Sequence, residues 1–129
     1  MGVESNLELT AGICEFRPRG TCTLVEAVDI IRRAVGYCRH RAVGKLLVDG
    51  RGLSGIPVPT LIDRFLMAED WAEEAKGMVV VSLVVHDEYI HPEKFGVKVA
   101  AAFGLTLDVF NSEAEAIKWL SSVDFTAPE

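Results

Sequence analysis

The sequence of 129 residues lacks the features that mark several large classes of protein. The valine-rich run 78–85 is far shorter than the roughly 20 apolar residues of a membrane-spanning helix. The first ten residues contain neither a basic segment nor an apolar signal core. The formal net charge of -6 provides no general attraction to a phosphate backbone. We therefore expect a cytoplasmic protein with no integral membrane association and no nucleic-acid partner.

Cysteine is also scarce, and the three that occur are Cys14, Cys22 and Cys38. They form no CxxC pair and no zinc-ligand cluster, and their odd number suits a reducing compartment. We expect them to be small apolar residues of the core. The segment 86–91 contains two histidines and two carboxylates, but its spacing lacks the specificity of a helical HExxH motif. No metal site and no cofactor is therefore expected.

The composition is that of a folded globular protein, with 50% hydrophobic and 25% charged residues. The length fits one ordinary domain, which we expect to span 1–129 with a loose tail from about 124. No internal repeat, linker or low-complexity tract divides it.

Hydrophobic periodicity predicts strands that alternate with helices. Leu7–Thr10 and Ile13–Phe16 are expected to form an opening hairpin around Gly12. Pro18 and Gly20 should interrupt this strand pattern, and a capping box formed by a threonine and the glutamate three residues later should start the first helix. Apolar residues then recur at spacings of three and four, which places them on one buried face: Leu24, Ala27, Val28, Ile31, Ala34, Val35 and Cys38.

The middle of the chain predicts two further strands around a second helix. Consecutive apolar residues at 45–48 are expected where both faces of a sheet are covered. Pro59 should occupy the first turn of the second helix, whose apolar positions continue to Ala75 and which Gly77 should close. The run 78–85 contains five valines and a leucine, so we expect it to be the central and most buried strand.

The last third predicts one more helix, one strand and a closing helix. Pro92 should open a helix that continues to position 102, and Gly104 should stop it before a strand over 105–110. Ser112 and Glu115 should form a capping box for the final helix. Because parallel neighbours need crossover connections of this length, we expect an α/β domain whose four- or five-stranded, mostly parallel sheet is flanked by about four helices.

Four segments carry a resemblance to a known family: LLVDGRGLSG at 46–55, the valine run, FGVKVAAAFGL at 95–105 and VFNSEAEAIKWL at 109–120. In these segments and in the order of its elements, the chain resembles the SpoIIAA-like family, which is related to STAS domains and to the Sec14 or CRAL-TRIO fold. The resemblance implies a sheet flanked by helices. It also implies one of two activities, a partner-binding regulatory switch or a module that holds an apolar or amphipathic ligand.

The resemblance stops short of the STAS phosphorylation site. In STAS anti-sigma-factor antagonists, a strand that ends in an acidic or amide residue is followed by an Asp-Ser-Ser-Gly-like segment with the phosphorylated serine. Asp49 matches the strand end, but the later segment, 56–60, reads IPVPT and has no serine. We therefore assign no phosphosite.

Polar residues follow two of the predicted strands, at the sheet edge where ligands of parallel sheets usually bind. We expect the two groups to lie close together, with apolar residues of the intervening loop partly exposed beside them. The structural alternative is an aspartate that caps a turn, an arginine that pairs with it and a merely exposed loop. The candidate ligand-binding or partner-binding residues are Asp49, Arg51, Ser54, Ile56, Val58, His86, Asp87 and Tyr89.

A basic cluster lies on and after the first helix and consists of Arg32, Arg33, Arg39, His40, Arg41 and Lys45. It could contact anionic lipid or an acidic partner. We favour a structural interpretation, because positive residues near a helix end complement its dipole and keep the exposed side hydrated.

The sequence contains no complete catalytic constellation. Ser54, His86 and Asp87 have the side chains of a hydrolase triad, but the segment GLSGI is not a GxSxG elbow. We expect a non-enzymatic regulatory or ligand-binding module that acts through a protein partner or a small ligand. Carriage of a lipid or other apolar ligand is the alternative, a metal-dependent or serine hydrolase is a remote one, and homodimerisation is a further prediction.

Overall fold

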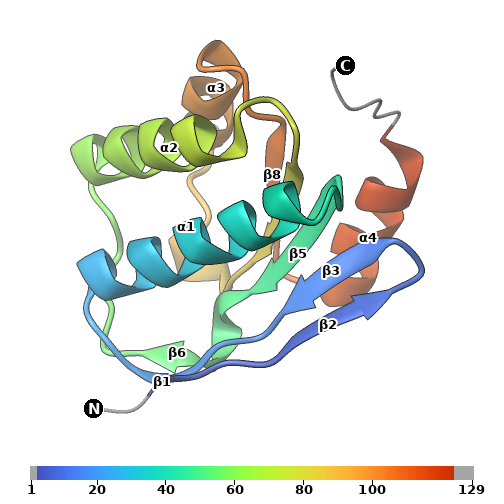
Figure 1. Cartoon of the computed structure of the whole chain (residues 1–129). Helices are drawn as coiled ribbons and strands as arrows, with labels where there is room; N and C mark the ends of the chain where they lie inside the picture. The colour runs from blue at the N-terminus through green and yellow to red at the C-terminus, as the bar shows by residue number, and fades with distance from the viewer. Residues whose placement is uncertain (1–2, 124–129) are drawn as a thin grey trace.

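The computed structural model describes residues 3–123 (Figure 1). Its main sheet contains five strands in the order β2-β3-β5-β7-β8. The first two form an antiparallel hairpin, and the other neighbours are parallel, so the predicted mostly parallel sheet is confirmed. The expected loose tail from about 124 lies outside the described residues. The strands are β2 (Leu7–Thr10), β3 (Ile13–Phe16), β5 (Lys45–Asp49), β7 (Val80–Val84) and β8 (Leu107–Phe110).

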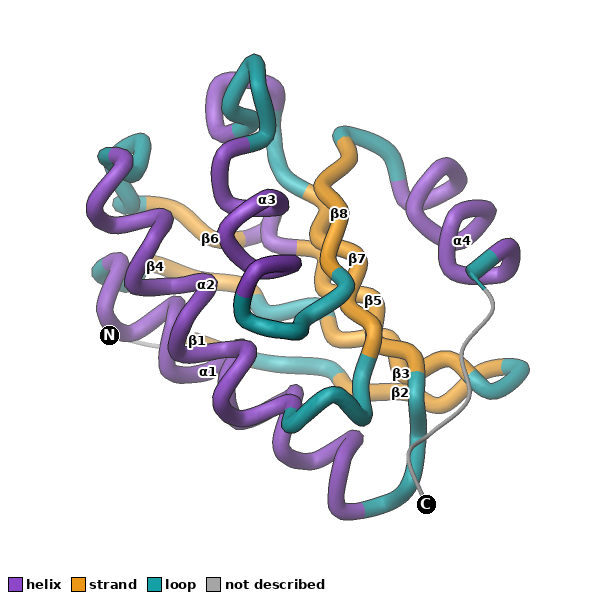
Figure 2. Tube along the Cα trace, turned by 90° about the horizontal axis from the view of Figure 1, so that it is seen from above, coloured by secondary structure: helices purple, strands orange, loops and turns teal. Residues whose placement is uncertain are grey.

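Four helices cover the two faces of this sheet unequally. Three lie on one face and the last lies alone on the other (Figure 2). Alternate residues of each strand therefore enter two separate apolar clusters, as the pleat of a sheet requires. The helices are α1 (Leu24–His40), α2 (Leu61–Ala75), α3 (Phe95–Ala102) and α4 (Glu113–Ser122).

A second, small sheet is absent from the sequence prediction. Its three strands lie in the order β1-β4-β6 and cover Val3–Glu4, Arg19–Thr21 and Leu53–Ser54. The expected interruption occurs at 17–18, between β3 and β4, but Gly20 lies within β4 and pairing resumes there. Strands of two or three residues are too short to show a period of two. Their pairing fixes the start of the loop that leads to α2.

The valine-rich run is interior but not central. It contributes β7, which lies between β5 and β8, whereas β5 is the middle strand. The prediction of a central strand is wrong by one position. A continuous apolar sequence indicates that both faces of a strand are buried, but it does not indicate the order of the strands in the sheet. Both strands are almost fully buried.

Side-chain caps start three of the helices. Thr23 and Glu26 form the predicted capping box of α1. Thr60 forms a second capping box with Asp63, so Pro59 precedes the cap and is not in the first turn of α2 as predicted. At α4, Ser112 accepts a hydrogen bond from the backbone N–H three residues later, at 3.4 Å.

Helix α3 begins three residues later than predicted. Pro92 lies in a turn that is closed by a hydrogen bond from the Lys94 N–H to the His91 carbonyl, at 2.9 Å. Lys94 then precedes the helix with a left-handed φ of 50°. Proline suits a tight turn as well as the first turn of a helix, so its presence alone did not distinguish the two.

Partly buried ion pairs join α1 to α2. Arg39 donates to the Glu74 backbone carbonyl at 2.7 Å and to its carboxylate at 3.0 Å. Arg32 donates to the same carboxylate at 3.3 Å. A Cβ at Gly36 would lie 2.6 Å from this carboxylate, so the glycine permits the close approach. Much of the basic cluster on α1 is thus engaged within the fold.

The three cysteines are buried, as expected. Burial raises the pKa of each thiol, because a thiolate would lose its hydration in the core. They act as small apolar residues.

Replacement of Val81 by aspartate is expected to prevent folding. The side chain is 1% exposed in β7. An unpaired buried charge costs several kcal/mol, a large part of the roughly 5–15 kcal/mol that stabilises a typical domain. Val25→Asp is the matched control, because Val25 is 78% exposed on α1. Thermal unfolding monitored by circular dichroism should show a cooperative transition for the control only; a normal transition in Val81→Asp would contradict the burial of β7.

Candidate functional site

An ion pair lies at the carboxyl end of the middle strand, β5. Asp49, the last residue of β5, is buried, and the following short turn brings Arg51 back over it. Arg51 Nε donates to Asp49 Oδ1 at 3.0 Å and Nη2 donates to Oδ2 at 2.8 Å. The Arg51 backbone N–H also donates to Oδ1, at 3.1 Å. Such a bidentate pair fixes the loop in one geometry.

The charge on Asp49 is stabilised by these bonds. Burial alone would raise the pKa of its carboxyl, but hydrogen bonding to the Arg51 side chain, to Glu113 and to the Arg51 backbone outweighs burial and lowers the pKa from 3.8 to about 2. The same contact raises the pKa of the Arg51 guanidinium. Asp49 is therefore ionised at neutral pH and is unsuited to accept a proton there.

The segments after β5 and β7 lie against each other. His86 Nε2 is 3.3 Å from the Arg51 carbonyl oxygen, and the Tyr89 hydroxyl donates to the Ile56 carbonyl. The structure thus brings together most of the residues that the sequence placed at this edge. Whether they bind a ligand or a partner stays a prediction.

A third strand end joins them through a residue that the sequence analysis did not select. Asn111 follows β8 and donates from Nδ2 to Asp87 Oδ1 at 2.7 Å. Its position directly after a predicted parallel strand was the available signal, since all such ends share one edge.

Ser54 stands apart from the polar cluster. Its Oγ is 3.0 Å from Thr21 Oγ1 and 3.5 Å from the Gly20 carbonyl oxygen, within the small sheet. Among residues 3–123, no hydrogen bond joins Ser54 to His86 or Asp87. In the same part of the chain, no group of three or more His, Cys, Asp or Glu side chains could hold a metal ion. Within these residues, Ser54 is therefore not hydrogen-bonded to the histidine or aspartate of the triad that the sequence suggested.

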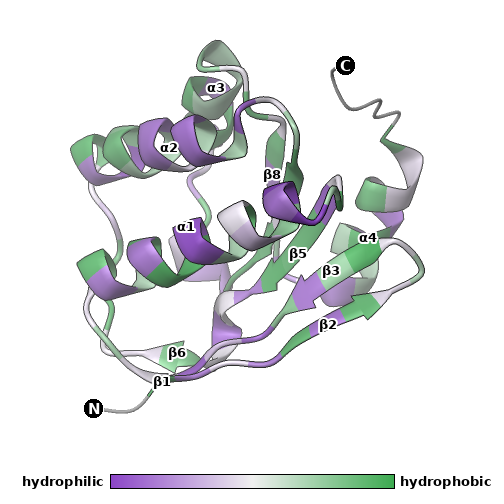
Figure 3. Ribbon diagram, in the orientation of Figure 1, coloured by the Kyte–Doolittle hydropathy of each residue, from purple (hydrophilic) through white to green (hydrophobic). Residues whose placement is uncertain are grey.

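An apolar surface lies next to this edge, on α2 and the loop before it. Five large side chains there are 40% to 73% exposed; the partial exposure of the loop residue Val58 was expected. Figure 3 shows the amino-terminal end of α2 in hydrophobic colours. We call this surface the α2 patch; it consists of Val58, Leu61, Ile62, Phe65 and Leu66.

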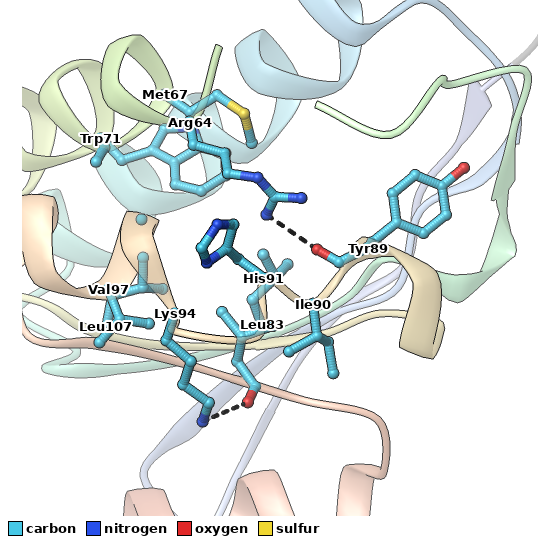
Figure 4. Close-up of a pocket in the computed structure, with 13 residues that line it drawn as sticks. Arg64, Met67, Trp71, Leu83, Tyr89, Ile90, His91, Lys94, Val97 and Leu107 are labelled. Atoms are coloured by element: carbon cyan, nitrogen blue, oxygen red, sulfur yellow. Dashed lines mark hydrogen bonds between the residues drawn. The ribbon is translucent and has the colours of Figure 1, made fainter. Parts of the chain in front are cut away.

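Two adjoining cavities lie under α2: one of about 110 Å³ beneath the same loop, and one of about 50 Å³ that reaches α3 and the segment after β7. Their common wall contains Arg64, Met67, Trp71 and Tyr89 (Figure 4). Ile56 and His86, two of the predicted site residues, line the larger cavity, while Val58 belongs to the α2 patch. The loop therefore contributes to a surface and to an interior space.

Two solved structures are similar to this chain in fold. One is an anti-sigma factor antagonist from Mycobacterium paratuberculosis, with a TM-score of 0.60, 12% identity, and coverage of 94% of this chain and 96% of that one. The other is an uncharacterized protein with a SpoIIAA-like fold from Shewanella loihica PV-4, with a TM-score of 0.50, 17% identity, and coverage of 92% and 94%. The chain has a SpoIIAA-like fold. No protein-family model matches the sequence, and no curated protein matches it.

The SpoIIAA-like fold here contains four helices, and none within residues 3–123 is long and apolar enough to cross a membrane. At these identities the two neighbours establish the fold and leave the activity to be argued from this chain's own residues.

The Asp49–Arg51 pair should make stability depend on acid pH. The folded-state pKa of about 2 lies below the usual 3.8, so the unfolded chain binds more protons between these values. The pair's contribution, up to about 2 kcal/mol, is present above about pH 4 and is lost as the pH falls toward 2. Asp49→Asn should remove it.

Urea unfolding of wild type and Asp49→Asn at pH 6, 4 and 2.5 measures this contribution, and their difference should shrink toward the lowest pH. Glu88→Gln, at an exposed site in the next strand-end segment, is the matched control. A difference that is constant with pH would show that the aspartate acts through packing alone.

Proposed function

We propose that the protein is a cytoplasmic, non-enzymatic regulatory module that acts by binding a protein partner through the α2 patch. The observation that carries this proposal is the exposure of five large apolar side chains on one helix end and its preceding loop. Contiguous apolar surface on a small protein is typical of a contact site.

The geometry of the patch suits a contact of this kind. Leu61, Ile62, Phe65 and Leu66 lie at spacings of one, four and five, so they form a continuous stripe on the outer side of α2. Phe65 also meets Phe103 edge to face, with ring centroids 5.5 Å apart, which fixes its ring. A preorganised aromatic side chain loses little conformational freedom on binding and is the usual anchor of an interface.

Charge beside the patch indicates the chemistry of the partner. A surface groove of about 390 Å³ runs between α1 and α2 and is lined by Val25, Leu66 and Met67 together with Asp63 and Asp70. Asp70 also lies 3.8 Å from Arg32 Nε. The whole chain is also acidic. The complementary surface is a protein segment with apolar side chains flanked by lysine or arginine, because opposite charges at a rim speed association and set orientation.

The structural neighbour named an anti-sigma factor antagonist supports the proposal, since that name describes action on another protein. The separation of Ser54 from His86 supports action without catalysis. The alternative of a lipid carrier is less well supported, because the larger cavity of about 110 Å³ falls short of the roughly 300–1,000 Å³ of usual ligand pockets.

A photo-cross-linking residue at position 62, compared with one at Lys118 on the opposite face, tests the proposal in cells. The proteins captured only from position 62 are then purified, and their affinity for the wild type is measured directly. Ile62→Asp should weaken that affinity at least about tenfold, because a charge replaces a contact in the patch. Leu9→Asp, an equally exposed apolar site on β2, should leave it unchanged.

Equal affinity of wild type and Ile62→Asp would remove the α2 patch from the function. Capture of a second copy alone, with a dimer in sedimentation that Ile62→Asp dissociates, would replace the partner by the predicted homodimer. A stoichiometric lipid in native mass spectra would favour the carrier.

A further inference from the structure

Arg64 is the one arginine in residues 3–123 whose pKa is lowered, and it lies between the two cavities. It belongs to the second turn of α2 and points inward (Figure 4). Burial lowers the pKa of its guanidinium, and no carboxylate of the described residues offsets this effect. By contrast, carboxylate partners raise the pKa values of Arg17, Arg32 and Arg51.

The hydrogen-bonding capacity of Arg64 is mostly unused. A guanidinium carries five N–H donors. Within residues 3–123, its side chain makes one hydrogen bond, from Nη1 to the Tyr89 backbone carbonyl at 3.0 Å. A partly buried cation with so few partners is costly to retain, and it is expected where an external anion completes its coordination.

The space beside this cation is apolar and small. The larger cavity is lined mainly by aliphatic and aromatic side chains, among them Leu24, Ile31, Ile56 and Trp71. Its volume of about 110 Å³, with a further 50 Å³ adjoining it, compares with roughly 150 Å³ for a cavity that admits benzene. A ring or short branched chain fits this space, whereas a long acyl chain exceeds it.

We propose that these cavities bind a small carboxylic acid with a compact apolar body, whose carboxylate pairs with Arg64. The planar fork of a guanidinium matches a carboxylate in a bidentate geometry, and the surrounding low dielectric strengthens the pair. The apolar body fills the larger cavity beneath the loop before α2. This inference goes beyond the proposed function, because the site is internal and distinct from the α2 patch.

Titration calorimetry with phenylacetate, benzoate and 4-methylpentanoate tests the proposal on the full chain, with phenylacetamide as the uncharged analogue. At least one acid should bind about tenfold or more tightly than the amide, since a charge-assisted hydrogen bond distinguishes them. A Trp119→Phe background leaves Trp71, which lines both cavities, as the only tryptophan to report binding by fluorescence.

Three variants distinguish the effect of the Arg64 charge on binding from the effects of cavity volume and of protein stability. Arg64→Met should abolish the preference for acid over amide and melt at the same or a higher temperature, because it removes a desolvated charge. Arg33→Met, at an exposed site on α1, is the matched control and should keep the preference. Ala27→Leu should fill the larger cavity and abolish binding of acid and amide alike.

The proposal is overturned if no acid binds at millimolar concentration, or if Arg64→Met binds the acids as wild type does. Binding of palmitate in preference to the three small acids would also overturn it, in favour of a lipid site. None of these results bears on partner binding at position 62, so the two proposals fail independently.

Discussion

Strand β5 lies in the middle of the sheet, and both of its faces must be covered by apolar side chains before any loop at its carboxyl end has a fixed position. Leu46 and Val48 face the layer of α1 and α2, while Leu47 faces α4. Full burial of each such side chain is worth roughly 1.5–3 kcal/mol. The Asp49–Arg51 pair begins directly where this cover ends, so the geometry of the polar edge depends on the packing of the strand beneath it.

Local patterns in the sequence predicted the elements that depend on local physics. The hairpin around Gly12, the Thr23 capping box and the buried run that became β7 all follow from turn conformation, side-chain capping or unbroken apolar composition. Strand order does not follow, because the valine run has the same composition whether it is central or second. The loop part of the α2 patch was expected to be partly exposed, but the exposed apolar residues of the helix were not predicted, for a related reason. A period of 3.6 identifies a common helix face at Leu61 and Phe65, but it does not specify whether another layer covers that face.

The candidate site shows the same division. The carboxyl ends of parallel strands share one edge, and this rule was sufficient to predict that the segments after β5 and β7 lie close together. Arg64 was not selected because the helical period groups it with the charged residues on one side of α2, for which hydration is the usual explanation. Its significance arises only in three dimensions, where α2 and the loop before it enclose apolar space around the guanidinium. Val58 faces outward from this loop while Ile56 faces inward, so one short segment joins the surface to the cavity.

The unequal cover of the sheet has a consequence for synthesis on the ribosome. Three helices on one face precede the strands they cover or lie between them in the chain, but the opposite face is covered by α4 alone, which emerges after every strand. Until residues 113–122 are available, Leu47, Val80 and Val84 have no protein layer to pack against. Until α4 has been synthesised, the nascent chain therefore presents an apolar sheet face to solvent, the kind of surface that chaperones bind and that aggregates when it is left uncovered.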